Sequence, residues 1–514
     1  MNAILGGIVF NASNILLVAA MAIAGMAVAF PVGVGIALAL GVIINYIFVP
    51  QGNAVWLFAG VALVVTAIII DALAYKKHSS SLKKVSGKGI LLSVSAGVLM
   101  SLFYRFVASS MAKSFEVPEA GKLTPYTAIF FFAVGVLVSN FLFNYLIMKR
   151  PFEGEPLSFK DYKKGNGKAL KTPIQISLRI TNICNHRCDV CGQYGKNGYM
   201  HFKESKDLLK TLPLDTYKKL VDEHANIKPL YYITGGEPFL YPGLVELCNY
   251  IKKMGSVVYV VTNGVMLEKY AEEIVKNKWD AILVSFDGPK DIHNKCRNHD
   301  GAYDAAMNGL IKLNKIKKEM KSIKPFVLTS TTISSVNAPV LEEIFDIGKI
   351  INPDLMVVYL SWFTSEKIGQ AHTKILEENL GITPYTWKSY AKEFSSEEAK
   401  SFKDALARVK NKKWPFLYFI IPDLKDKDFE NYYLKPEEFF GYDKCVAPFI
   451  MVDIMPNGDV VTCRDYIDVV VGNITEKPLL EIWNDEKFVA WRKLLIKHHG
   501  KLPQCSRCCG LMGF

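Results

Sequence analysis

The stretch CNHRCDVC at residues 184–191 decides the fold of the soluble part of the chain, because it places Cys184, Cys188 and Cys191 in a C-x3-C-x2-C spacing. Three thiolates within eight residues can cover one face of a 4Fe-4S cube and leave the fourth iron without a protein ligand. A structural zinc site is the alternative, but zinc takes four ligands, and His186 is poorly placed between the first two cysteines to be the fourth. The spacing therefore predicts an iron–sulfur cluster with one iron open to a substrate.

Short apolar strands alternate with amphipathic helices from residue 174 onward. The expected strands are residues 175–180, 231–233, 257–261, 282–285, 326–333 and 356–360. Helices are expected between them, among them residues 215–226, with Asp215 as the N-cap, and residues 302–318. Six such repeats predict an α/β fold with a parallel sheet, whose chemistry lies at the carboxyl ends of the strands.

Short polar motifs stand at those strand ends. GGEP at 235–238 follows the second strand, TNG at 262–264 the third, and SFDG at 285–288 the fourth. Their glycines let a ligand approach the backbone, and Glu237, Ser285 and Asp287 offer acceptors for ammonium and hydroxyl groups. Gly-Gly and Asp-Gly alone are ordinary turn signals, but their order after the cysteine loop is specific.

With this three-cysteine loop and these motifs, residues 174–362 resemble the core of a radical SAM enzyme, whose fold is a partial (β/α)6 barrel. The resemblance implies that the open iron of the catalytic 4Fe-4S cluster chelates S-adenosylmethionine (SAM). One electron then cleaves SAM to methionine and a 5′-deoxyadenosyl radical, which abstracts hydrogen from a substrate. An electron donor such as a flavodoxin or ferredoxin is implied as a partner.

The same resemblance assigns SAM-binding roles. Gly235, Gly236 and Glu237 would hold the methionyl ammonium, Ser285 and Asp287 would lie near the ribose, and Asn263 is counted with them. Residues around Thr332, Ile333, Tyr359 and Leu360 would flank the adenine. Arg297 is expected to meet the SAM carboxylate, with a surface loop residue as the alternative. Val190 stands where the family often has an aromatic residue before the third cysteine.

A second cysteine group occupies the C-terminal segment. Cys445, Gly458 and Cys463 follow the pattern C-x12-G-x4-C around a hairpin signal at residues 456–458, and Cys505, Cys508 and Cys509 lie near the end. The pattern resembles the SPASM/twitch extension of radical SAM enzymes, a small α+β domain that binds an auxiliary 4Fe-4S cluster, and five cysteines suit its one-cluster twitch form. A zinc knuckle is the alternative. We expect Cys445, Cys463, Cys505 and Cys508 as ligands, because adjacent residues usually point in different directions, and Cys509 is the alternative to Cys508.

The first 150 residues have a different composition. Hydrophobic runs at about 4–24, 26–48, 54–74, 89–108 and 124–147 are each long enough to span a bilayer, so we expect five transmembrane helices rather than buried helices of a soluble core. The basic flanks at Lys76 to Lys88 and at Lys149-Arg150 favour an outside N terminus and a cytoplasmic enzyme, in a multi-pass protein of the cell membrane.

This segment also resembles, from GGIVFN at 6–11 through LTPYTA at 123–128 to RPF at 150–152, the middle helices of ureide-permease-like members of the drug/metabolite transporter superfamily. Those transporters use about ten helices, so five would form an anchor or a half-bundle. Asn11, Asn14, Asn140 and Asn144 could line a polar path, and interhelical hydrogen bonding is the simpler interpretation.

The predicted organisation is multi-domain: residues 1–150 in the membrane, a linker at 151–173, the radical SAM core at 174–362, a connecting region at 363–440 and the cluster domain at 441–514. More than half of the net charge of +12 lies in residues 1–150, so nucleic acid is not an expected partner. The predicted function is a membrane-anchored radical SAM oxidoreductase acting on a peptide, or next on a lipid or isoprenoid. A transporter or sensor regulated by the iron–sulfur domain is the alternative.

Overall fold

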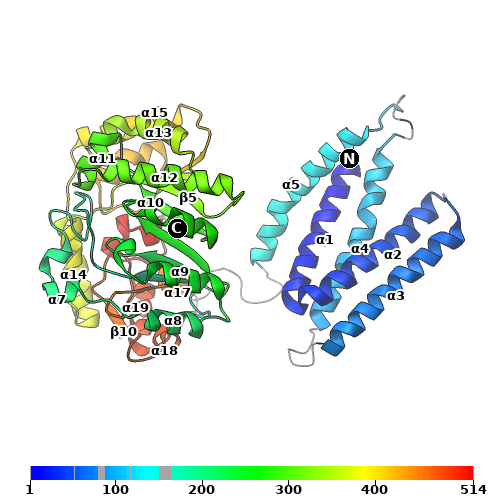
Figure 1. Ribbon diagram of the computed structural model, residues 1–514, viewed down its shortest axis with the longest axis horizontal. Coiled ribbons are helices and arrows are strands. Elements are labelled where there is room, and N and C mark those ends of the chain that lie inside the picture. Colours follow the sequence, from blue (N-terminus) through cyan, green and yellow to red (C-terminus); the bar gives the residue numbers. More distant parts are fainter. Residues whose placement is uncertain are drawn as a thin grey trace. The chain divides into compact units, whose positions relative to one another are not determined.

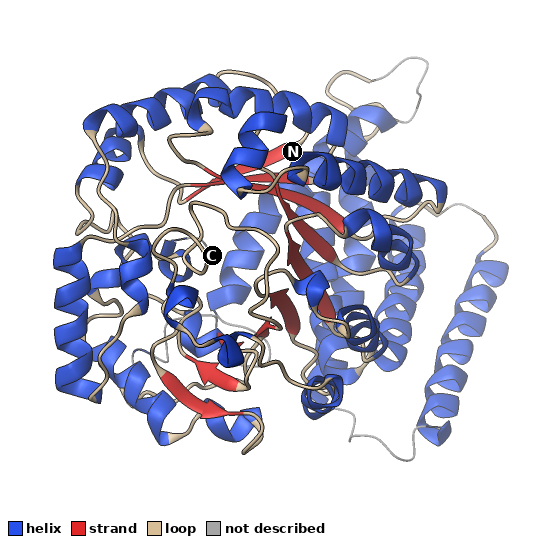
Figure 2. Cartoon of the chain, turned by 60° about the vertical axis from the view of Figure 1, so that its left-hand side comes forward, coloured by secondary structure: helices blue, strands red, loops and turns tan. Residues whose placement is uncertain are grey.

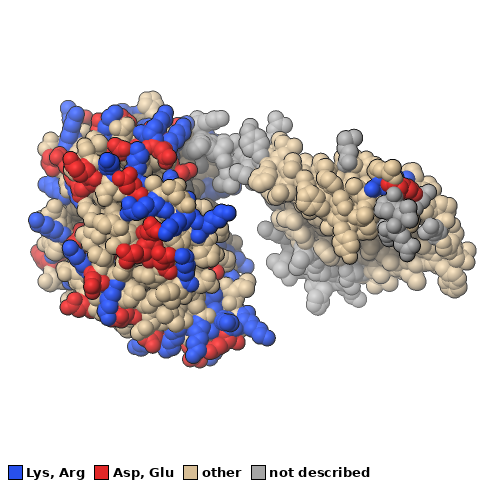
Figure 3. All heavy atoms as spheres, turned by 90° about the horizontal axis from the view of Figure 1, so that it is seen from above, with Lys and Arg blue, Asp and Glu red and all other residues tan. Residues whose placement is uncertain are grey.

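The computed structural model describes residues 2–50, 52–78, 87–112, 114, 119–149, 162 and 164–512. The chain divides into two compact units, Met1–Lys160 and Asp161–Phe514, and each is described by itself (Figure 1). Their surfaces differ in charge. Over the face shown in Figure 3, Lys, Arg, Asp and Glu side chains cover the C-terminal unit, whereas the N-terminal unit carries only one small group of them.

The N-terminal unit is a bundle of five helices, α1 (Asn2–Ala24), α2 (Met26–Phe48), α3 (Ala54–His78), α4 (Gly87–Ser110) and α5 (Pro125–Lys149). Within the described residues, four of them, all but α3, contain an apolar stretch long enough to cross a membrane. The apolar part of α3 is the shorter Ala54–Ile68. Of the five predicted spanning helices, four therefore have the length and composition that crossing a membrane requires. Two parts of the basic flanks that predicted the orientation lie outside the described residues. They are most of the loop between α3 and α4, and Arg150.

Polar side chains join the helices of this bundle. The side-chain amide of Asn11 on α1 donates to the hydroxyl of Ser139 on α5 at 2.9 Å, and the hydroxyl of Ser13 donates to the carbonyl of Ala96 on α4 at 2.8 Å. Asn144 instead donates to Asn140 within α5. Since buried polar groups need partners in an apolar bundle, Asn11 serves helix packing, as the simpler interpretation predicted.

The C-terminal unit is built on one ten-stranded sheet in the order β10-β9-β8-β1-β2-β3-β4-β5-β6-β7. The strands are β1 (Gln175–Arg179), β2 (Leu230–Thr234), β3 (Val257–Thr262), β4 (Ala281–Ser285), β5 (Phe326–Thr332), β6 (Leu355–Tyr359), β7 (Leu417–Ile421), β8 (Met451–Ile454), β9 (Asp459–Val461) and β10 (Val470–Asn473). Strands β1 to β7 pair in parallel, which confirms the six predicted strands and adds β7 from the connecting region.

Helices cover the outer side of these strands (Figure 2). They are α7 (Ser205–Leu208), α8 (Leu214–Glu223), α9 (Leu244–Lys253), α10 (Leu267–Lys276), α11 (Lys290–Arg297), α12 (Ala302–Glu319), α13 (Leu341–Ile351), α14 (Glu366–Leu380), α15 (Ser396–Lys410) and α16 (Phe429–Leu434), followed in the C-terminal segment by α17 (Ala447–Ile450), α18 (Leu479–Trp483), α19 (Glu486–Lys497) and α20 (Cys509–Met512). The expectation for Asp215 was wrong: Pro213 occupies the N-cap of α8 and Asp215 lies in its first turn, where a carboxylate still favours the helix dipole.

The C-terminal cysteine segment adds directly to the sheet of the barrel. Strand β8 pairs in parallel with β1 and antiparallel with β9, which confirms the hairpin predicted at residues 456–458. A continuous group of buried apolar side chains runs from Ala169 to Met512 and includes Cys445 and Cys505. This core joins the second cysteine group to strand β1, from whose carboxyl end the first cysteine loop leaves.

Candidate active site

The cysteine loop leaves the carboxyl end of β1, and each of its three sulfurs receives an N–H group. The backbone N–H of His186 points to Cys184 Sγ at 3.5 Å, that of Tyr194 to Cys191 Sγ at 3.4 Å, and Nη1 of Arg297 to Cys188 Sγ at 3.8 Å. Burial nevertheless raises the pKa of the Cys184 thiol to about 12. Such a thiol ionises at neutral pH only beside strong positive charge, which metal ions supply.

The spread of these thiols distinguishes a cluster from a single ion. Thiolates bound to one zinc ion at about 2.3 Å lie within about 4.6 Å of each other. Among the described residues, only Asp465, Cys508 and Cys509 form a group of three ligand atoms all within 4.8 Å. The thiols of Cys184, Cys188 and Cys191 are more widely spread, as three corners of a cube require. The structure thus favours the cluster over zinc.

The loop is tied to the neighbouring strand ends. Backbone N–H groups of Arg187 and Asp189 donate to the carbonyls of Arg297 and Cys296 at 3.3 and 3.4 Å. On the other side, the side-chain amide of Asn263, after β3, donates to the side-chain oxygen of Asn185 at 2.7 Å. Asn263, which was predicted as a SAM-binding residue, therefore positions the cysteine loop in this structure.

His186 lies inside the loop as a neutral ring. It is 1% exposed, both of its ring nitrogens lack a hydrogen-bond partner among the described residues, and its ring lies 4.6 Å from that of His299. Burial, with the neighbouring His299 and Arg297, lowers the pKa of His186 to about 3. His186 is therefore a packed, uncharged residue under physiological conditions.

The two glycines of the GGEP motif allow close backbone packing. A Cβ atom on Gly235 would lie 2.6 Å from the carbonyl oxygen of Thr181, and one on Gly236 would clash with the carbonyl of Ile183. The backbone N–H groups of Gly236 and Glu237 donate to these same carbonyls at 2.7 and 2.8 Å. The motif thus holds the segment that leads into the cysteine loop, and its contact with SAM remains a prediction.

The carboxylate of Glu237 is buried and fully engaged. It accepts hydrogen bonds from the backbone N–H of Phe239 at 3.1 Å, from the hydroxyl of Thr262 at 2.7 Å and from the backbone N–H of Asn263 at 2.7 Å. Burial raises the pKa of Glu237 to about 7, although these hydrogen bonds oppose the rise. In this structure its side chain joins the ends of β2 and β3, so a bond to the SAM ammonium stays a prediction.

Asp287 and Arg297 form a buried ion pair beside Cys188. Nη2 of Arg297 lies 2.5 Å from Oδ2 of Asp287, and their side chains are only 12% and 3% exposed. Asp287 also accepts the backbone N–H of Thr332 at 3.3 Å, and its own N–H donates to Nδ1 of His293 at 3.0 Å. Arg297 is thus an internal residue rather than a surface one, and its predicted contact with the SAM carboxylate is not tested by this pairing.

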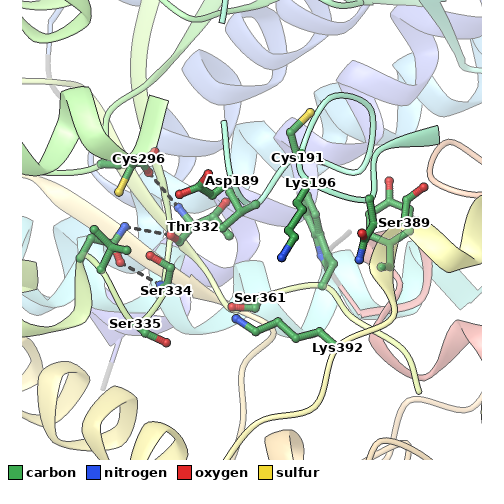
Figure 4. Close-up of a pocket in the computed structure, with 18 of the residues that line it drawn as sticks. Asp189, Cys191, Lys196, Cys296, Thr332, Ser334, Ser335, Ser361, Ser389 and Lys392 are labelled. Carbon is green, nitrogen blue, oxygen red and sulfur yellow. Dashed lines mark hydrogen bonds between the residues drawn. The ribbon is translucent and has the colours of Figure 1, made fainter. Parts of the chain in front are cut away.

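A cavity of about 380 Å³ opens at the carboxyl ends of the strands (Figure 4). Among the predicted site residues, Cys191 and Asp287 line it, and so do Val190 and Thr332. Gly235, Gly236, Glu237, Asn263, Ser285 and Arg297 are not part of its wall. Ile333 and Leu360, expected beside the adenine, are fully buried and do not line this cavity, so their contact with the adenine stays a prediction.

The rest of the wall comes from loops without a recognised motif and combines polar side chains with apolar ones such as Trp362 and Phe394. It includes Ser334 and Ser335 after β5, Ser361 after β6, and Ser389 and Lys392 from the connecting region. Figure 4 shows Lys196 and Lys392 extending into the cavity from different loops, with Ser361 between them. The run of hydroxyl residues after β5 is a signal that the sequence offered, whereas nothing local marks Lys392.

The second cysteine group gathers where the hairpin, α19 and the C-terminal end meet. Cys445 Sγ lies 3.7 Å from the carbonyl of Gly510, and the backbone N–H of Leu502 points to Cys505 Sγ at 3.4 Å. Burial and the nearby thiols of Cys445 and Cys505 raise the pKa of Cys463. Segments distant in sequence therefore bring these thiols together at one buried site.

Cys508 and Cys509 do not point in different directions. Their sulfurs lie 3.8 and 3.0 Å from the same carboxylate oxygen of Asp465. Cys508 has an extended backbone, with φ −82° and ψ 135°, at the end of a 3-10 helix, and Cys509 begins α20. This change of backbone conformation between the two residues turns both side chains to one side, so the reason given for preferring Cys508 was wrong, while the choice between them stays open.

Comparison with known protein families assigns both sites. Residues 178–336 match the radical SAM superfamily, and residues 445–509 match the SPASM iron–sulfur cluster-binding domain. The chain therefore carries a radical SAM domain, which binds a 4Fe-4S cluster and SAM, and a SPASM domain, which indicates auxiliary iron–sulfur clusters. The resemblance of the membrane helices to a transporter is not confirmed.

Individual relatives are distant. The chain is 26% identical over 372 residues to Fe-coproporphyrin III synthase of Methanosarcina barkeri, covering 66% of this chain and 81% of that protein. It is 28% identical over 135 residues to the antilisterial bacteriocin subtilosin biosynthesis protein AlbA of Bacillus subtilis, covering 26% and 28%. The chain is also similar to the crystal structure of Streptococcus suis SuiB bound to SAM. The match covers 71% of this chain and 82% of the SuiB chain, with 14% identity and a TM-score of 0.45.

Proposed function

We propose that this chain is a membrane-anchored radical SAM oxidoreductase that modifies a peptide. The observation that carries the proposal is the position of the three-thiol loop, whose third cysteine, Cys191, lines the cavity at the carboxyl ends of the strands. When bound, the cluster supplies one electron to SAM, which yields methionine and a 5′-deoxyadenosyl radical that abstracts hydrogen from the substrate.

The residues of the chain position these reactants. Cys184, Cys188 and Cys191 would hold the cluster, and Arg297 keeps positive charge beside Cys188 while it neutralises Asp287. The backbone of Gly235 and Gly236 lies next to the start of the cysteine loop, where the ammonium group of SAM would be placed. The hydroxyl-bearing wall formed by Thr332, Ser334 and Ser361 would contact the ribose and the substrate.

The cysteines of the SPASM domain would hold the auxiliary cluster within the same hydrophobic core. Cys445, Cys463 and Cys505 are the shared members of both possible ligand sets, and Cys508 or Cys509 completes the set. Because abstraction of a hydrogen atom leaves an unpaired electron on the substrate, a second redox centre in the same unit can take up that electron and produce an oxidised product.

The polar side chains in the wall of the cavity support a peptide over a lipid. Its wall carries serine and threonine hydroxyls, the amides of Asn197 and Asn337 and the ammonium groups of Lys196 and Lys392, which suit backbone amides and carboxylates better than a hydrocarbon chain. AlbA is named for the biosynthesis of a bacteriocin, which also supports a peptide. The apolar helices α1, α2, α4 and α5 support a location in the cell membrane, and the basic flanks at Lys76 to Lys88 and at Lys149-Arg150 favour an enzyme unit in the cytoplasm.

Two measurements test this function. Anaerobically reconstituted and reduced protein should convert SAM to 5′-deoxyadenosine, and the Cys191→Ala variant should not. Mass spectrometry of peptides and metabolites from cells with and without the gene should then show a peptide whose mass falls by two hydrogens, as either a desaturation or an internal cross-link requires, only when the gene is present. A changed lipid or tetrapyrrole with an unchanged peptide pool would contradict the substrate class but not the SAM chemistry.

A further inference from the structure

A groove in the N-terminal unit lies apart from both cysteine sites. Helices α2, α3 and α4, which Figure 1 shows side by side, enclose a volume of about 580 Å³. Most of its wall is apolar, with Leu38, Val42 and Leu57 among its members. An open apolar groove between membrane helices accommodates hydrocarbon chains readily.

The end of this groove is polar and cationic. Arg105 lines it together with Tyr104, Asn45 and Tyr46, and the guanidinium carbon of Arg105 lies 4.4 Å from the centre of the Phe48 ring. Asp71 of α3 is the one acidic residue in the sequences of the five helices, and its side chain lies outside the described ones. Among the described residues, Arg105 forms no ion pair. A cation inside an apolar bundle without an acidic partner is expected to bind an anion from outside the chain.

The depth of Arg105 fits the head of a lipid. It stands five residues before the end of α4 at Ser110, which is about 7.5 Å along a helix axis. If α4 spans the bilayer, this depth is the boundary between acyl chains and headgroups, where the tyrosine hydroxyls can also reach phosphate oxygens.

We propose that this groove binds a phospholipid with a net negative headgroup, its phosphate on Arg105 and one acyl chain along the apolar wall of α2. The site rests on the membrane location proposed above and is independent of the reaction in the barrel. Guanidinium–phosphate pairing is bidentate and strong, and the unpaired charge selects an anionic headgroup over a zwitterionic one.

Native mass spectrometry of the full-length protein in detergent tests the site, with phosphatidylglycerol and phosphatidylcholine of identical acyl chains as probes. The wild type should retain one phosphatidylglycerol, and Arg105→Gln should weaken retention about five- to tenfold. Lys122→Gln is the matched control, because Lys122 donates to the carbonyl of Ser109 at the same end of α4 but does not line the groove. It should retain the lipid as the wild type does, and Arg105→Lys should retain part.

Equal retention of phosphatidylglycerol by the wild type and Arg105→Gln would overturn the site, and so would equal loss in Lys122→Gln or equal retention of phosphatidylcholine. Displacement of the lipid by millimolar inorganic phosphate would mean a free-anion site instead. SAM cleavage by the same samples should be unchanged in every variant, and an unchanged helix content and melting temperature in detergent shows that the bundle of each variant is folded. A loss of SAM cleavage in the wild type would instead count against the proposed function alone.

Discussion

Arg297 forms an ion pair with Asp287 at 2.5 Å inside the barrel, and the same guanidinium donates to the sulfur of Cys188 at 3.8 Å. One cation thus serves a carboxylate at the end of β4 and a thiol that would ligate iron. Burial raises the pKa of Asp287, and Arg297 offsets part of this rise. The pair fixes α11 against the cysteine loop, so its loss should affect both stability and the cluster.

Arg297→Met should reduce the free energy of unfolding by about 3–5 kcal/mol, because it leaves the carboxylate of Asp287 buried without its partner. The double variant Arg297→Met/Asp287→Asn should recover much of this loss. The exposed pair Lys290–Asp304 is the control, and Lys290→Met should have a much smaller effect, because solvent screens this pair. Chemical denaturation under anaerobic conditions measures the free energy of unfolding of the three variants. Equal effects of Arg297→Met and Lys290→Met would show that the buried pair is not stabilising.

Cys184→Ala, Cys188→Ala and Cys191→Ala should each abolish SAM cleavage and reduce the iron content from about eight per chain towards four, because each removes one of the three ligands of the catalytic cluster. Cys248→Ala should keep both the iron and the activity, since Cys248 is fully buried in α9 and contacts only the hydrophobic core. Iron analysis and detection of 5′-deoxyadenosine test this. Cleavage of SAM by any of the three variants would contradict the assignment of these cysteines as ligands of the catalytic cluster.

The auxiliary cluster should distinguish Cys508 from Cys509. Asp465 raises the pKa of both thiols, but Cys505 and Cys463 are also among the charges that raise the pKa of Cys508, whereas Arg464 opposes the rise for Cys509. The iron content of Cys508→Ala should therefore fall from about eight per chain towards four, and this variant should still cleave SAM. The iron content of Cys509→Ala should stay at about eight. The reverse pattern would move the ligand to Cys509. One zinc ion and about four irons per wild-type chain would show that the C-terminal cysteines bind zinc instead of an auxiliary cluster.

Glu237 should make the stability of the protein depend on pH. Its pKa in the folded protein is raised to about 7, compared with about 4.3 in an unfolded chain. The folded state therefore holds this proton more tightly, and the stability it contributes is present below about pH 4.3 and is lost as the pH rises through about 7. The free energy of unfolding relative to Glu237→Gln should fall by up to about 3 kcal/mol between about pH 5 and 8.

Denaturation at fixed ionic strength across this pH range measures the effect. The matched change Glu246→Gln, at a side chain that is 64% exposed, should leave the pH profile of the wild type in place. Parallel profiles for the wild type and Glu237→Gln would show that Glu237 is ionised over the whole range.

The topology of the bundle can be tested at Ser114, an exposed residue between α4 and α5. If the N terminus is outside and α1 to α4 all cross the membrane, as the five-helix prediction requires, an even number of crossings precedes Ser114. A cysteine introduced there should then react with a membrane-impermeant maleimide in intact cells. The native cysteines all lie after residue 180, on the predicted cytoplasmic side, so the wild type is the control. Labelling only after permeabilisation would contradict the predicted topology, because it would place Ser114 on the cytoplasmic side.

The sequence by itself determined the strands, the two cysteine groups and the apolar helices, because these depend on local patterns. Six strands were predicted within one or two residues, since the strands of a buried parallel sheet are short apolar runs between polar loops. The spacing of Cys184, Cys188 and Cys191 predicted a cluster because one short loop contains all three ligands.

Only the tertiary structure decided which polar residues meet. Asp287, Arg297 and Cys188 lie on separate segments, and Lys392 reaches the cavity from a region without any motif, so no local pattern could reveal these contacts. The direction of Cys509 depends on a change of backbone conformation at one residue, and the addition of β8 to the edge of β1 depends on packing across more than 270 residues. Such contacts are determined by the shared hydrophobic core, whose geometry exists only once the whole unit has folded.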